Sequence, residues 1–76
     1  MDWIKIKDCQ NARAEMPQEK QFLAIWKGAV CLCQFDEIEE VFAICYYPAS
    51  YESFVVSPER EIKFTHWAEI PLPEDY

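Results

Sequence analysis

Thiols and an imidazole are the groups in this chain with the most specific chemistry, because both are preferred zinc ligands. Structural zinc sites usually hold two ligands on a tight Cys-x-x-Cys knuckle, which the sequence lacks. Two of the cysteines are instead two residues apart on a predicted strand, with Cα atoms about 6.5 Å apart. Buried free thiols are therefore the favoured interpretation, and a converging zinc site is the alternative. The residues concerned are Cys9, Cys31, Cys33, Cys45 and His66.

The single histidine lies in a run from Glu61 to Ile70 that alternates apolar and polar residues. A period of two predicts a strand with His66 on the same face as Phe64, toward the core, and Trp67 on the opposite face. A lone histidine on an apolar face is most often a hydrogen-bonded core residue. General acid–base catalysis needs a partner in hydrogen-bond reach, and no spacing indicates one. We expect no enzyme activity, no cofactor and no metal.

Acidic residues dominate the charge of the chain. Lys and Arg number 7 and Asp and Glu number 14, so the net charge is −7. Nucleic acids and anionic membranes both need clustered cations, so we expect neither as a direct partner. The same charge permits binding to a basic protein surface. Because no apolar run approaches the roughly 20 residues that span a bilayer, and the first residues lack a signal-peptide core, we expect a cytoplasmic protein.

An acidic run is the first candidate for contacting that partner. It consists of Asp36, Glu37, Glu39 and Glu40, in a predicted connection between two strands. The pattern of a calcium-binding loop is absent. A solvated turn is the simpler interpretation, and a contact with a basic partner is the more specific one.

Aromatic residues are the second candidate. Trp26, Tyr47 and Trp67 place bulky rings on both faces of the predicted sheet, and such a sheet must be covered twice. The rest of the chain supplies the simpler cover. Exposed Trp and Tyr are also typical interface anchors, so a partner surface or a homodimer contact is the second interpretation.

A chain of 76 residues with 51% hydrophobic residues is expected to form a single domain over residues 1–76. Lys27-Gly28 is a natural hairpin turn, and Asp8 is a helix cap followed by a short apolar stripe that Pro17 ends. The predicted class is α+β, a small antiparallel meander of four to five strands with one short N-terminal helix. The predicted strands cover residues 22–26, 29–35, 41–47 and 61–70, with a brief fifth near 54–56.

The two ends of the chain resemble a known family. Trp3-Ile4, Met16-Pro17, and Thr65-His66-Trp67 followed by Pro71-Leu72-Pro73 are similar to motifs of small phage and prophage proteins catalogued as domain of unknown function five-five-one. The resemblance implies a phage-type accessory protein in the bacterial host cytoplasm, with no assigned activity to carry over.

By analogy with compact acidic phage proteins, we expect a non-enzymatic binding protein that inhibits a host defence protein through acidic and aromatic surface. Two alternatives stay open. One is a protein that sequesters a nucleotide signal by stacking it on Trp and Tyr rings, and the other is a small structural zinc-binding domain.

Overall fold

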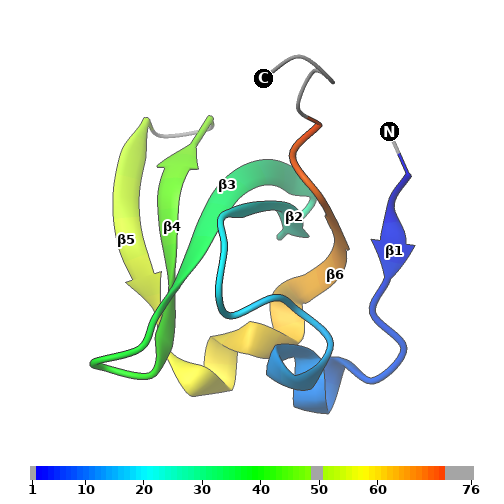
Figure 1. The fold of residues 1–76 in the computed structure, drawn as a ribbon, viewed down its shortest axis with the longest axis horizontal. Helices are drawn as coiled ribbons and strands as arrows, with labels where there is room; N and C mark the ends of the chain where they lie inside the picture. Colours follow the sequence, from blue (N-terminus) through cyan, green and yellow to red (C-terminus); the bar gives the residue numbers. More distant parts are fainter. Residues whose placement is uncertain (1, 49–50, 72–76) are drawn as a thin grey trace.

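The computed structural model describes residues 2–48 and 51–71. They form one antiparallel sheet of six strands in the order β1-β6-β2-β3-β4-β5 (Figure 1). Two 3₁₀ helices, η1 and η2, lie together at one end of the sheet. The elements are β1 (Ile4–Lys5), η1 (Cys9–Ala14), β2 (Phe22–Trp26), β3 (Ala29–Asp36), β4 (Val41–Tyr47), β5 (Glu52–Val56), η2 (Pro58–Lys63) and β6 (Phe64–Ala68). No helix among the described residues is long and apolar enough to cross a membrane.

The α+β class with four to five strands and one N-terminal helix is wrong. The sheet has six strands, and the residues that the structure describes contain no α-helix. The side chain of Asp8 does cap η1 by accepting from the backbone N–H of Gln10 at 3.1 Å, but Asn11 leaves helical geometry at φ −129°, ψ 41°. So short a segment gains little from helix propensity. Its shape follows the packing of Ala12 and Met16 against the core.

The last predicted strand is also corrected, because residues 61–63 belong to η2. Pro58 stands in the first turn of η2, where its missing N–H is harmless. The two 3₁₀ helices are joined by Arg13, whose Nη2 lies 2.6 Å from Oε1 of Glu61 and whose Nε lies 3.1 Å from Oε2. This hydrogen bonding raises the pKa of Arg13. The pair therefore ties η2 to η1.

A β-bulge in β6 reverses the alternation that the sequence suggests. Ile25 pairs with His66, but the next residue of β2, Trp26, pairs with Phe64. Thr65 is therefore an extra residue on β6. An extra residue exchanges the two faces of a strand beyond it, because side chains alternate with a period of two.

Because of this bulge, Trp67 packs against the core and His66 does not. The ring of Trp67 meets Phe22 edge-on, with centroids 6.3 Å apart. His66 is half-buried on the other face, and its Nδ1 lies 3.0 Å from Oγ1 of Thr65. The predicted orientation, with His66 inward and Trp67 outward, is therefore wrong. Assigning side chains to faces by strict alternation along the sequence does not detect an extra residue in the strand.

A second bulge lies in β4. Leu32 pairs with Tyr46 and the next residue of β3, Cys33, pairs with Ile44, so Cys45 is the extra residue. It leaves Cys45 and Tyr46 on the outer side of the sheet, while Ile44 is fully buried. An extra residue of this kind usually increases the local twist of its strand.

The core is a cluster of aromatic rings on the inner face of the sheet. Phe22, Phe42 and Phe64 are fully buried. The ring centroid of Phe42 lies 5.9 Å from those of Phe22 and Phe64 and 4.9 Å from that of Phe35. Such edge contacts add about 0.5–1.5 kcal/mol each to the burial itself. Large rings suit a short chain, because a small domain buries few residues completely.

Replacing the central ring tests this core. Phe42→Leu removes three ring–ring contacts and part of the buried volume, so we expect it to lower the free energy of unfolding by about 1–3 kcal/mol. Ile38→Ala is the control, because Ile38 is 94% exposed and its loss should change stability by less than about 0.5 kcal/mol. Urea unfolding followed by tryptophan fluorescence measures both. Equal effects of the two substitutions would contradict the aromatic core.

Candidate functional site

The acidic residues predicted to contact a partner lie together in the turn between β3 and β4. Asp36 ends β3, and its Oδ1 accepts hydrogen bonds from the backbone N–H groups of Ile38 at 2.9 Å and Glu39 at 3.2 Å. Glu40 closes the turn in the left-handed region, at φ 56°. Residues 37–40 are exposed. Asp36 therefore shapes the turn, whereas Glu37 and Glu39 present their side chains to solvent.

An isoleucine stands among these carboxylates. Ile38 is 94% exposed, between Glu37 and Glu39. Burying such a side chain in a partner would contribute about 1.5–3 kcal/mol. An exposed apolar side chain of this kind is available to anchor a contact with a partner. The signal was present in the sequence, since Asp-Glu-Ile-Glu-Glu places one apolar residue inside a charged run, but the run was interpreted by its charge alone.

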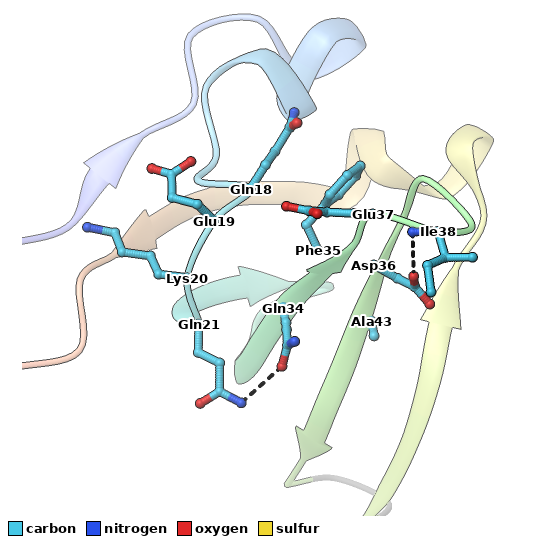
Figure 2. A pocket seen from close by; sticks show the side chains of 10 residues that line it. All are labelled: Gln18, Glu19, Lys20, Gln21, Gln34, Phe35, Asp36, Glu37, Ile38 and Ala43. Atoms are coloured by element: carbon cyan, nitrogen blue, oxygen red, sulfur yellow. Dashed lines mark hydrogen bonds between the residues drawn. The ribbon is translucent and has the colours of Figure 1, made fainter.

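A groove of about 750 Å³ opens beside this turn (Figure 2). One wall is the segment of residues 18–21 that leads into β2, and the other is formed by the end of β3, the acidic turn and Ala43 of β4. Figure 2 shows the ring of Phe35 between the two walls. The groove thus joins the exposed isoleucine to a larger concave surface.

The groove exists because β3 extends farther than β2. Pairing of β2 with β3 stops at Phe22 and Cys33, while pairing of β3 with β4 continues to Asp36. Along this last part of β3, the described residues form no strand on the β2 side. The amide of Gln21 donates to Oε1 of Gln34 at 3.2 Å where the two segments separate (Figure 2). A strand edge left open in this way suits an extended segment of another protein.

Carboxylates determine the charge of the groove. Glu19, Asp36 and Glu37 line it together with one amine, that of Lys20. The Nζ of Lys20 lies 2.7 Å from Oε1 of Glu69, and this hydrogen bond lowers the pKa of Glu69. Because the lysine is already paired, the groove is acidic. It suits a cationic chain and disfavours a nucleotide phosphate.

None of the three aromatic residues predicted to contact a partner lines the groove. Trp26 is only 3% exposed, and its indole N–H donates to the backbone oxygen of Arg60 at 3.2 Å. Tyr47 is half-buried with its ring centroid 5.9 Å from that of Trp26, and Trp67 is half-buried against Phe22. The structure brings the four acidic residues together and places the three aromatic residues in or against the core.

The candidate zinc ligands are spread over the molecule. Cys31 and Cys33 are buried, while Cys9 and Cys45 are exposed. Within residues 2–48 and 51–71, no group of three or more His, Cys, Asp or Glu is placed to hold a metal ion. Burial raises the pKa of the Cys31 and Cys33 thiols. These two thiols therefore remain protonated at neutral pH and act as small apolar side chains.

Comparisons of the chain with models of known protein families, with curated proteins and with solved structures find no match.

The burial of the thiols predicts how they react. At pH 7.5 an alkylating reagent should modify Cys9 and Cys45 within minutes and leave Cys31 and Cys33 intact, because only a thiolate attacks and a buried thiol is both protonated and covered. All four should react in concentrated urea. Mass spectrometry of the digested protein locates the modified residues. Modification of Cys31 or Cys33 in the folded protein, as fast as that of Cys9, would contradict the inner position of these two residues.

Proposed function

We propose that the chain is a non-enzymatic binding protein that engages a partner with a basic surface through the β3–β4 turn and the groove beside it. The observation that carries the proposal is Ile38, 94% exposed between two carboxylates at the mouth of an acidic groove. The net charge of −7 adds long-range attraction toward a basic surface, which raises the rate of encounter.

The geometry of the turn supports one kind of partner surface. It has an apolar pocket for Ile38, rimmed by Lys or Arg side chains that meet Glu37 and Glu39. A short extended segment next to that pocket would lie in the groove, along the open edge of β3. In this arrangement the burial of the isoleucine contributes about 1.5–3 kcal/mol to binding. The exposed carboxylates supply orientation and a fast association rate, since individual surface ion pairs add little.

We further propose where the partner is found. The resemblance of the chain ends to small phage proteins supports a partner in the bacterial host cytoplasm, where the chain would inhibit a defence protein. An acidic turn covering a basic surface would block the access of nucleic acid to that surface, because both compete for the same Lys and Arg side chains. Inhibition would then need no chemical step.

Charge-matched variants test the role of the turn. The immobilised wild-type chain is incubated with bacterial lysate. The amount of each lysate protein that it retains is compared with the amount retained by two double variants. Glu37→Lys with Glu39→Lys should weaken capture at least tenfold, because the turn then repels a basic surface. Glu52→Lys with Glu59→Lys changes the net charge equally at exposed sites elsewhere and should leave capture nearly unchanged. Ile38→Ser should also weaken capture about tenfold, without any change in charge.

Three results would contradict the proposal. Equal loss of capture in both double variants would make binding an effect of net charge alone. Full capture by Ile38→Ser would remove the isoleucine from the interface. If both turn variants retain every lysate protein that the wild-type chain retains, the turn has no partner in that lysate. The inhibitory part fails separately if expressing the chain does not improve phage growth on bacteria that carry the captured protein.

A further inference from the structure

One residue of β3 has both of its backbone groups turned toward the groove. Trp26 and Ala29 flank a two-residue turn and therefore form a hydrogen-bonded pair, and such pairs alternate along the β2–β3 ladder. Ala29, Cys31 and Cys33 accordingly direct their N–H and C=O groups toward β2. Phe35 is the next residue of this series, but pairing with β2 has already stopped at Cys33.

The N–H and C=O of Phe35 are free for another chain. On the β4 side of β3, Phe35 lies opposite Phe42, between the hydrogen-bonded pairs of Gln34 and Asp36. Within residues 2–48 and 51–71, no backbone hydrogen bond outside the strand ladders involves Phe35. One donor and one acceptor therefore open into the groove of about 750 Å³ (Figure 2).

The inner side of this edge is aromatic. The ring of Phe35 is half-buried against Phe42, and the guanidinium of Arg13 lies 5.9 Å from its centroid. Residues paired across two strands share a face, so a side chain opposite Phe35 would meet this ring. An apolar side chain is favoured there, because Arg13 already takes the place of a cation over the ring.

The outer side of the same edge differs before and after Phe35. Because side chains alternate along a strand, Gln34 and Asp36 both lie on the outer face. Asp36 lines the groove, with Glu19 on the other wall. At Gln34 the chain itself fills the neighbouring place, since the side-chain amide of Gln21 donates to Gln34 at 3.2 Å. A cation therefore meets carboxylates beside Asp36 and amides beside Gln34.

We propose that the groove takes up an extended segment of the partner in which a Lys or Arg immediately precedes an apolar residue, and that this apolar residue pairs with Phe35 as an added antiparallel strand. The inference rests on the proposed function, because the segment belongs to the same basic partner. In an antiparallel pair, one residue bonds to both groups of Phe35. The residue before it then lies opposite Asp36, where its positive charge is matched.

Charge and burial argue against a second copy of the chain as the occupant. A chain of net charge −7 is repelled by an acidic groove. The chain has a lysine before a large apolar residue at Lys5-Ile6 and at Lys63-Phe64, but Ile6 and Phe64 are both buried in the core. A separate cationic segment suits the groove better.

Two five-residue peptides test the proposal by titration of the isotope-labelled chain, followed by the amide signals of Phe35 and Asp36. Acetyl-Ser-Arg-Val-Gly-Ser-amide has the proposed order, and acetyl-Ser-Val-Arg-Gly-Ser-amide has the same composition and charge in the reverse order. Peptide concentrations up to about 5 mM suit the millimolar Kd that so small a contact gives. We expect the first peptide to bind with a Kd about fivefold lower than the second.

Methylated peptides test the backbone pairing. N-methylation of the valine removes the N–H that bonds to the C=O of Phe35, so it should weaken binding about tenfold. N-methylation of the arginine is the control, because its N–H points away from β3, and it should change the Kd less than about twofold.

Two variants of the chain test the charge of the groove. Glu19→Gln should weaken binding of the first peptide about threefold, because Glu19 lines the groove. Glu59→Gln removes an exposed carboxylate of η2 and should leave the Kd nearly unchanged. Thermal unfolding of each variant establishes that it is folded.

Three results would overturn the inference. Equal Kd values for the two peptide orders would make binding an effect of net charge. Equal effects of the two N-methyl groups would remove the pairing with Phe35. Absence of any shift at about 5 mM of either peptide would leave the groove without this occupant.

The inference and the proposed function fail in different ways. Lysate capture that is lost in the turn variants, together with peptides that do not bind, would overturn the inference alone. Peptides that bind in the proposed order, together with lysate capture that the turn variants retain in full, would overturn the proposed role of the turn alone.

Discussion

Thr65, the extra residue in β6, determines which rings close the core. It lets Phe64 and Trp67 both face inward from a strand of five residues. Trp67 then covers Phe22, while Phe64 meets Phe42 at 5.9 Å. A strand without the bulge would turn an imidazole into this aromatic cluster, where its ring nitrogens would lose water without gaining partners. The bulge thus keeps the polar ring of the strand out of the core.

The same geometry separates charge from apolar surface. With the aromatic rings inside, the middle of the outer face carries aliphatic side chains and Tyr46. Polar and charged residues of the same face lie toward its edges, with Asp36 at the end of β3 and Lys5 on β1. The acidic turn and the groove lie at one end of the sheet, beside the part of β3 that extends past β2. Two surfaces of different chemistry result. One is the acidic groove beside the β3–β4 turn, and the other is the aliphatic middle of the outer face.

Local signals in the sequence were sufficient for the centre of the fold. The predicted strands over residues 22–26, 29–35 and 41–47 agree with β2, β3 and β4 within one residue. Lys27 and Gly28 adopt φ angles of 51° and 77°, as a tight hairpin turn between such strands requires. The acidic turn was located correctly as well. These features depend on neighbours in the chain, which is why periodicity and turn chemistry reveal them.

Features that depend on distant residues were missed. Nothing in the neighbouring sequence indicates that β6 lies between β1 and β2, or that Thr65 is an extra residue in the pairing of β6. The sequence also does not show that β3 extends past the end of β2 and opens a groove. Trp26 was assigned to a surface because both faces of β2 are apolar, and periodicity does not show which face is the core. The segment after Asp8 was expected to be a helix because its capping signal is real, but the packing of Ala12 and Met16 against the core determined its form.

Proton–proton contacts of the rings at positions 66 and 67 test the bulge most directly. Nuclear Overhauser spectroscopy of the folded protein should connect the indole of Trp67 with the ring of Phe22, and the imidazole of His66 with the methyl groups of Ile25. Contacts of His66 with the ring of Phe22, together with a Trp67 indole that has none, would show a strand that alternates without an extra residue. That result would contradict the inner core and the outer face described for this sheet.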